Sequence, residues 1–187
     1  PEMPSILQQL LVAGNETTTH SIAEGVLLLI ENPDQHALLK ADPGLIPNFT
    51  EEVLRLSSPT ANMWRVVTRD TEINGVPVTK GSMVQLRFSS ANRDEGVYPA
   101  PHRLDVTREN ARTHVAFGHG VHMCIGASLA RGELNVAFRV LLERLDRVLE
   151  HLVQIQLVGD REFRRHACGH RMIAQDPQVV GHTMPIA

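Results

Sequence analysis

The sequence predicts a mainly α-helical fold with a small β-hairpin region. Two long segments, residues 5–31 and 127–149, carry apolar side chains at helical spacing. Between them, the run Glu72-Ile-Asn-Gly-Val-Pro-Val78 contains the Asn-Gly pair that is typical of a tight β-hairpin turn. Long helices on either side of a hairpin therefore define the expected fold class.

Shorter helices are expected to follow the first long one. Proline disfavours the helical conformation in the residue before it, so Asn32-Pro33 is expected to end the first helix. A short helix then covers residues 33–40, and Asp42-Pro43-Gly44 interrupts the chain. The next helix covers residues 46–57 and ends before Ser58-Pro59.

The middle of the chain changes to strand-forming residues. Segments 64–69 and 82–88 are strand candidates on either side of the hairpin, and Pro77 suits an edge strand. Residues 91–113 are rich in loop-forming residues. Short strands and coil are expected from Val153 onward.

The composition excludes several function classes. The chain has 187 residues, a formal net charge of −3 and two cysteines, Cys124 and Cys168. This charge gives no indication of a nucleic-acid partner, and two cysteines form no disulfide framework, which favours a reducing, cytoplasmic location. Polar residues interrupt the apolar stretch 6–30, so we expect a buried helix there and no membrane span. Such a helix needs neighbours on most faces, and the chain offers few, as expected for the C-terminal part of a longer domain.

The run Phe117-Gly-His-Gly-Val-His-Met-Cys124-Ile-Gly126 is the most informative motif. It places one cysteine in a glycine-rich loop directly before a helix. Backbone N–H groups and the positive end of that helix stabilise a thiolate, and a thiolate is a good axial ligand for haem iron. The simpler alternative is that Cys124 is a small buried residue.

Zinc binding is a further alternative for this loop. His114, His119, His122 and Cys124 are all zinc-ligating residue types, but their spacing differs from that of common zinc sites. The run His166-Ala-Cys168-Gly-His170 is a second such group. We therefore regard both groups as weak zinc candidates.

A polar motif, Ala13-Gly14-Asn15-Glu16-Thr17-Thr18, lies in the middle of the first helix. The Thr17 hydroxyl can donate back to the Ala13 carbonyl and loosen the local hydrogen-bond ladder. Glu16 beside it is an ionisable proton carrier. The alternative is that residues 16–19 form the solvated face of an amphipathic helix.

The third motif is Glu52-Val-Leu-Arg55. Its spacing places the carboxylate and the guanidinium on one helix face, and Arg103 after Pro101-His102 is a candidate third member. The alternative is an exposed surface pair that contributes about 1 kcal/mol or less.

The order of these motifs resembles that of the cytochrome P450 family, in its bacterial type. The resemblance runs from about Leu7 to Leu149 and concerns the C-terminal, haem-binding part of the family fold. We therefore expect residues 1–187 to be the C-terminal portion of a single P450 domain. Residues 151–187 match the family poorly and receive no site.

The resemblance implies a role for each motif. Cys124 would be the axial ligand of the iron of haem b, with Phe117 packed near the sulfur, and Glu16 and Thr17 would deliver protons during oxygen activation. The remaining implied positions are the oxygen groove (Ala13, Gly14), the ligand loop (Gly118, Gly120, Gly126), the haem propionates (Arg65, His122), the structural triad (Glu52, Arg55, Arg103) and a substrate-facing segment (Thr60, Ala61, Asn62, Met63).

The function implied is a monooxygenase that inserts one atom of O2 into a small organic substrate. Electrons would come from a ferredoxin- or flavodoxin-type donor, with Arg108, Arg112 and Arg131 as candidate basic contacts. Two alternatives remain, namely a haem-binding protein or fragment without turnover, and a zinc- or partner-binding domain without haem.

Overall fold

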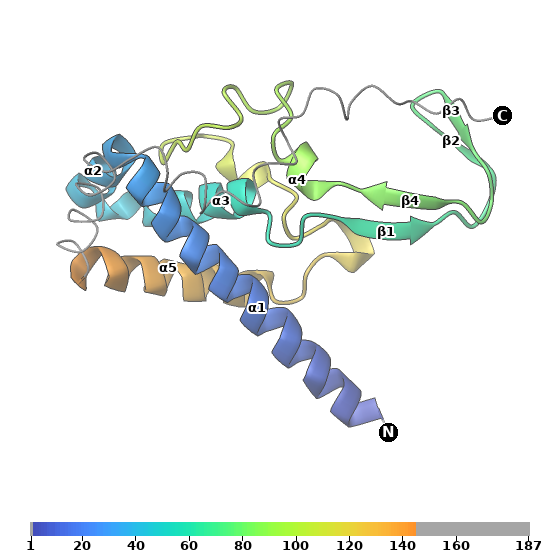
Figure 1. Cartoon of the computed structure of the whole chain (residues 1–187), viewed down its shortest axis with the longest axis horizontal. Coiled ribbons are helices and arrows are strands. Elements are labelled where there is room, and N and C mark those ends of the chain that lie inside the picture. Colours follow the sequence, from blue (N-terminus) through green and yellow to red (C-terminus); the bar gives the residue numbers. More distant parts are fainter. Residues whose placement is uncertain (1, 145–187) are drawn as a thin grey trace, which may run out of the picture. The chain divides into compact units, whose positions relative to one another are not determined.

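The computed structural model describes residues 2–144 (Figure 1). Four helices form its larger part: α1 (Glu2–Glu31), α2 (Pro33–Ala41), α3 (Ile46–Ser57) and α5 (Ala127–Arg144). The short α4 (Phe88–Ala91) and three 3₁₀ turns, η1 (Pro43–Leu45), η2 (Ala111–Thr113) and η3 (Gly120–His122), complete the helical elements. The predicted mainly helical fold is confirmed. The expected end of the last helix near Leu149 and the strands expected after Val153 lie outside the described residues.

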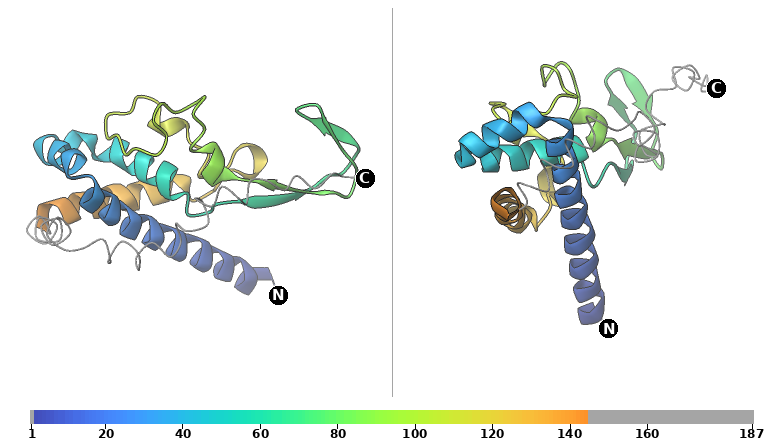
Figure 2. Two further views of the ribbon diagram at one scale, coloured as in Figure 1. Left: turned by 45° about the horizontal axis from the view of Figure 1, so that its top comes forward. Right: turned by 60° about the vertical axis from the view of Figure 1, so that its left-hand side comes forward.

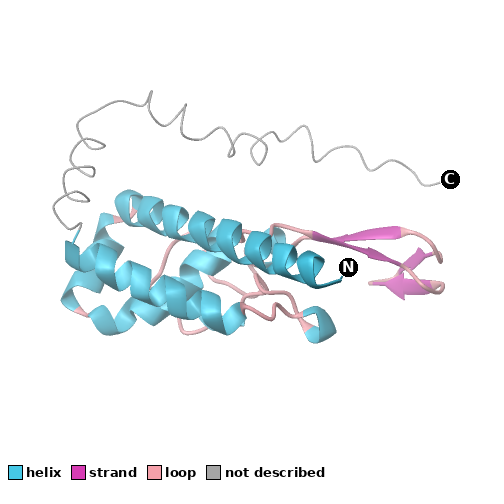
Figure 3. Cartoon of the chain, turned by 90° about the horizontal axis from the view of Figure 1, so that it is seen from below, coloured by secondary structure: helices cyan, strands magenta, loops and turns pink. Residues whose placement is uncertain are grey.

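The strands form two separate antiparallel ladders (Figure 3). β1 (Met63–Val66) pairs with β4 (Met83–Leu86), and β2 (Thr71–Ile73) pairs with β3 (Val76–Val78). Asn74 and Gly75 connect β2 to β3 with φ angles of 49° and 82°, the left-handed conformation that an Asn-Gly hairpin turn requires. The hairpin predicted from this pair is therefore confirmed.

Helix α3 lies at the centre of the helical part. It contacts α1 and α5, and the loop-rich segment 91–113 returns to it through η2. The core consists of apolar side chains from these elements: Leu28, Leu29, Leu39, Ile46, Phe49, Val53, Leu54, Leu56, Leu104, Val106, Ala116, Leu134 and Phe138. Because neighbours surround α3, even its polar side chains between residues 50 and 55 are buried.

The two halves of α1 have different environments. Ser21, Gly25, Leu28 and Leu29 are buried, whereas the side chains of residues 3–16 are exposed. Figure 2 shows this first half extending beyond the other helices. The expectation of a buried helix is therefore correct only for the second half, because no described element packs against the first.

Gly25 allows α1 to approach α5 closely, and Gly25→Ala is expected to lower the free energy of unfolding by about 1–3 kcal/mol. A methyl group at this position would lie 2.5 Å from Phe138 Cε1 and 3.3 Å from Val53 Cγ2. Phe138 is fully buried, so its ring has no free space to move into. Urea unfolding followed by circular dichroism measures this loss.

Gly14 provides the matched control in the same helix. A methyl group there meets no atom within 4 Å. Gly14→Ala is therefore expected to raise stability by about 0.5–1 kcal/mol, because alanine favours the helix over the unfolded chain. Equal effects of the two substitutions would contradict the close α1–α5 contact.

Among residues 2–144, none of the helices combines the length and the apolar character that a membrane crossing needs.

Candidate functional site

The cysteine loop is a compact set of turns between Phe117 and α5. The Cys124 N–H donates to the Phe117 carbonyl at 2.9 Å, and the Met123 N–H donates to the Gly120 carbonyl at 3.0 Å. Gly118 and Gly120 adopt φ angles of 70° and 73°, where residues with side chains are strained. The loop therefore requires glycine at both positions, and it leaves the Cys124 thiol free and exposed.

Phe117 is the aromatic side chain at the base of this loop. Its ring packs against the core. The Arg131 guanidinium lies 4.6 Å from the ring centroid, and the His114 ring centroid lies 5.8 Å away. Both neighbours of Phe117 are in turn bound to one carboxylate of α3.

That carboxylate belongs to Glu51. Its Oε1 accepts from Arg131 Nε at 2.7 Å, and its Oε2 accepts from Arg131 Nη2 at 3.1 Å and from His114 Nε2 at 2.9 Å. Burial raises the pKa of Glu51, but the hydrogen bonds from His114 and Arg131 outweigh it, so that the net pKa lies below its ordinary value. Glu51 is therefore ionised in the folded protein at neutral pH.

The lowered pKa of Glu51 predicts a loss of stability in acid. A carboxyl group whose pKa is lower in the folded state stabilises the fold above its unfolded pKa, ordinarily 4.5, and loses that contribution as the pH falls through the folded pKa. The difference in unfolding free energy between the wild type and Glu51→Gln is thus expected to be constant near pH 7 and to shrink below about pH 4.5. Urea titrations at several pH values measure it. A difference independent of pH down to the acid limit would contradict the ion pairing of Glu51.

The second buried carboxylate of α3 is Glu52, which forms a bidentate pair with Arg55. Arg55 Nε lies 2.6 Å from Glu52 Oε1, and Arg55 Nη2 lies 2.9 Å from Glu52 Oε2. Both side chains are fully buried. The surface-pair alternative for this motif is therefore wrong.

Arg55 also binds the loop-rich segment that follows the strands. It donates to the carbonyl oxygens of Asn92 (2.9 Å), Pro101 (2.6 Å) and Arg103 (3.2 Å). Glu52 Oε2 accepts from the Asp105 N–H at 3.1 Å. The pair thus holds the backbone of this loop against α3.

The expected third member of the triad, Arg103, needs correction. Its side chain is 67% exposed and lies 3.6 Å from Asp34, so only its carbonyl reaches Arg55. Arg108 takes the place beside Glu52 instead, with Nε 3.1 Å from Oε1 but without hydrogen-bond geometry. The Arg108 guanidinium also donates to the Pro99 carbonyl at 2.8 Å.

The three arginines that are candidate contacts for an electron donor differ in their exposure. The Arg108 side chain is only 6% exposed and is therefore inaccessible to a partner. Arg131 is mostly covered and engaged with Glu51, whereas the Arg112 side chain is 79% exposed. Of the three arginines, only Arg112 presents an exposed positive charge.

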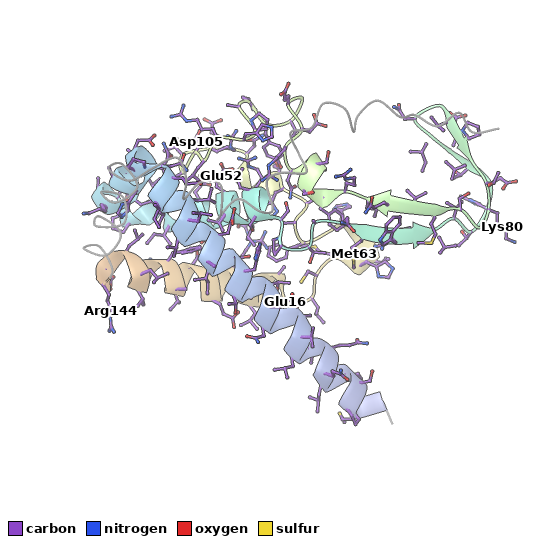
Figure 4. All side chains as sticks on the ribbon, viewed as in Figure 1. Glu16, Glu52, Met63, Lys80, Asp105 and Arg144 are labelled. Carbon is purple, nitrogen blue, oxygen red and sulfur yellow. The ribbon has the colours of Figure 1, made fainter. Side chains whose placement is uncertain are left out.

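The polar motif of α1 lies in the exposed half of that helix, where Figure 4 marks Glu16. The Thr17 hydroxyl donates to the Ala13 carbonyl at 2.8 Å, as predicted. The helix stays α-helical through this turn, so the expected loosening is not observed. Ala13, Gly14 and Glu16 are exposed, and Thr17 is half-buried.

The other expected site residues lie in or near β1 and in the cysteine loop. Met63 begins β1, as Figure 4 shows, and Thr60, Ala61 and Asn62 precede it. Arg65 is half-buried in the same strand, and its Nη1 donates to the Trp64 carbonyl at 2.8 Å. His122 is exposed on η3, and Gly126 immediately precedes α5.

The zinc alternative gains no support from the cysteine loop. In the described part of the chain, His, Cys, Asp and Glu side chains form no group of three or more that could hold a metal ion. His114 is instead bound to Glu51. The second candidate group, residues 166–170, lies outside the described residues.

Comparison with known proteins decides the family. The sequence profile of the cytochrome P450 family matches residues 45–165, which is more than half of the chain. The chain belongs to the cytochrome P450 family. The resemblance inferred from the motifs is therefore confirmed.

Bacterial P450 proteins are among the relatives. The chain is 49% identical over 144 residues to cytochrome P450 105C1 of a Streptomyces species, covering 76% of this chain and 38% of the relative. It is 43% identical over 151 residues to a steroid C26-monooxygenase of Mycobacterium tuberculosis, covering 81% and 38%. The chain thus spans little more than a third of the length of these relatives.

Solved P450 structures agree with this fold. Cytochrome P450-153 from Novosphingobium aromaticivorans matches with a TM-score of 0.72 at 44% identity, covering 74% of this chain and 35% of that one. The tirandamycin C-bound P450 monooxygenase TamI gives the same values. The structure described here is a partial P450 fold.

The cysteine loop fits the haem that P450 membership implies. The Cys124 thiol is free and exposed, as an axial sulfur ligand must be. A methyl group at position 126 would lie 3.8 Å from the Cys124 sulfur. Because Gly126 has no side chain, the loop leaves this space beside the sulfur open. The exposed apolar side chains of Val121, Met123 and Ile125 also suit contact with an apolar macrocycle.

Proposed function

We propose that this chain forms the haem-thiolate part of a monooxygenase that inserts one atom of O2 into a small organic substrate. The observation that carries the proposal is the cysteine loop, in which a free, exposed Cys124 is fixed by its own amide to Phe117 directly before α5. P450 membership supports the same chemistry.

Named side chains would hold the haem and tune it. Cys124 Sγ would bind the iron as a thiolate, and Phe117 would shield one side of the loop. Arg65 and His122 would donate to the propionates, since both are suitable donors to carboxylates. When bound, the haem would supply oxygen activation, which an anionic sulfur ligand favours.

Proton delivery would fall to α1. The Thr17 hydroxyl, already hydrogen-bonded to the Ala13 carbonyl, would pass protons through water from the exposed carboxylate of Glu16. Ala13 and Gly14 would line the groove for O2. The segment Thr60–Met63 would face the substrate.

Electrons would come from a ferredoxin- or flavodoxin-type donor in the cytoplasm. The exposed guanidinium of Arg112 is the basic contact that we assign to such an acidic partner.

The spectrum of the haem-reconstituted chain, reduced under carbon monoxide, tests the proposal. A strongly red-shifted Soret band is expected, because the axial ligand is a thiolate. Product formation with a surrogate electron donor then separates a monooxygenase from a haem-binding protein without turnover. A Soret band of the histidine-ligated type, or no haem uptake, would contradict haem-thiolate binding by this chain.

Thr17→Ala is expected to uncouple oxygen consumption from product formation. Without the hydroxyl, residue 17 could no longer pass protons, and the fraction of the consumed oxygen that is released as peroxide is expected to rise about tenfold. Peroxide and product are measured per NADH consumed. The matched control is Thr19→Ala, because Thr19 is an exposed threonine on the same helix. Unchanged coupling in Thr17→Ala would remove Thr17 from the relay.

A further inference from the structure

We propose that Glu51 is a positioning residue for the cysteine loop, and that it acts by holding Arg131 over Phe117. Glu51 lies in α3, and its carboxylate is hydrogen-bonded to Arg131 and His114. The inference rests on the proposed function only in taking Cys124 as the axial ligand.

Glu51 fixes the position of the Arg131 side chain. Two hydrogen bonds, from Nε at 2.7 Å and from Nη2 at 3.1 Å, fix the plane of the guanidinium. A bidentate pair of this kind restricts orientation as well as distance. Because Arg131 lies on α5 and Glu51 on α3, the pair also joins the two helices.

Arg131 in turn contacts the ring of Phe117. The guanidinium carbon lies 4.6 Å from the ring centroid, which is within cation–π range. The ring is therefore held between the core and a fixed cation. The carbonyl of the same residue, Phe117, is the acceptor for the Cys124 N–H at 2.9 Å.

His114 provides a second connection from Glu51 to the same segment. Its Nδ1 accepts from the Ala116 N–H at 3.1 Å, which leaves Nε2 as the nitrogen that donates to Glu51 at 2.9 Å. Glu51 thus fixes the backbone just before Phe117 as well as the cation above its ring. Removal of the carboxylate leaves both partners, Arg131 and His114, without their acceptor.

Hydrogen exchange of the Cys124 amide tests the proposal without haem. In Glu51→Gln the protection of this amide is expected to fall about tenfold, because the Phe117 carbonyl is no longer held in place. The amide of Leu29, in the buried half of α1, reports on global opening of the same molecules. Arg112→Gln is the matched control, since Arg112 lies 3.8 Å from Glu51 but is largely exposed. This control is expected to change Cys124 protection less than twofold.

A double-mutant cycle tests the route through the ring. In a Phe117→Leu background, Glu51→Gln is expected to lower Cys124 protection less than it does in the wild type, because the contact through the ring is already lost and only the connection through His114 remains. Arg131→Lys keeps the charge but loses the planar fork, and it is expected to reproduce part of the effect of Glu51→Gln on Cys124 protection with a smaller loss of stability, because His114 stays bound to Glu51.

Two results would overturn the proposal. One is an equal loss of protection at Cys124 and Leu29 in both Glu51→Gln and Arg131→Lys, which would show a general stabilising role. The other is a full effect of Glu51→Gln in the Phe117→Leu background. Loss of the thiolate-type Soret band in the wild type would instead contradict the proposed function, and it would leave the exchange result unaffected.

Discussion

Replacing Cys124 with serine is expected to abolish the red-shifted Soret band of the reduced, carbon monoxide-treated chain. A serine hydroxyl is a far weaker donor to iron than a thiolate and stays protonated at neutral pH. The loop itself is expected to persist, because the hydrogen bond to the Phe117 carbonyl uses the backbone N–H of residue 124. The change is therefore confined to the ligand atom, and the expected loss of the thiolate spectrum is complete.

The chain contains its own control for this substitution. Cys168 is the other cysteine, and Cys168→Ser should leave the thiolate spectrum unchanged. Circular dichroism of both variants verifies that the helices are retained. A thiolate-type band that survives in Cys124→Ser and disappears in Cys168→Ser would transfer the ligand assignment to Cys168.

Replacing Arg55 with methionine is expected to cost about 3–5 kcal/mol of unfolding free energy. The substitution keeps an unbranched chain in the core but leaves the Glu52 carboxylate buried without its bidentate partner. It also removes the donors to the carbonyls of Asn92, Pro101 and Arg103. Urea unfolding measures the loss, which is a large share of the about 5–15 kcal/mol that stabilises a typical native protein.

Arg103→Gln and Arg108→Gln show which arginine completes the buried site. The exposed Arg103 side chain should contribute about 1 kcal/mol or less, whereas the loss of the buried Arg108 charge should cost well over 1 kcal/mol. The reverse order would restore Arg103 as the third member. Equal small effects would show that Glu52 depends on Arg55 alone.

Local signals were sufficient to predict most of the fold. The Asn74-Gly75 turn, the proline-delimited helices α2 and α3 and the helix after the cysteine loop all follow from backbone preferences within a few residues. The same holds for the hydrogen bond between Thr17 and Ala13, which spans one helical turn. The Glu52–Arg55 pair also followed from its spacing, although its burial did not.

Burial depends on which elements cover a face, and sequence spacing does not encode that. Glu51 occurs next to Glu52 in a helix, and periodicity alone would place one of the two in solvent. Both are buried because α1 and α5 cover one part of α3 and the loop 91–113 covers another. For the same reason, the sequence suggests only zinc ligation for His114, and it contains no signal for the hydrogen bond between His114 and Glu51, which are 63 positions apart.

The choice between Arg103 and Arg108 illustrates the same limit. Both arginines occur in one loop, only five positions apart. The path of the backbone decides between them, because it directs the Arg103 carbonyl toward Arg55 and the Arg103 side chain toward Asp34. A pattern of side chains contains no information about that path.

The anchors of this loop have a consequence for how its sequence can vary. Arg55 binds it through the main-chain oxygens of residues 92, 101 and 103, which every amino acid supplies. The exposed side chains of the segment, such as His102 and Glu109, are therefore not needed to keep it in place. The exposed positions of this stretch can thus accept a wide range of residues. Substitutions, labels or a new recognition sequence can be introduced there, beside the cysteine loop, while hydrogen bonds between main-chain atoms and the buried side chains of Arg55, Arg108 and Glu52 keep the backbone in position.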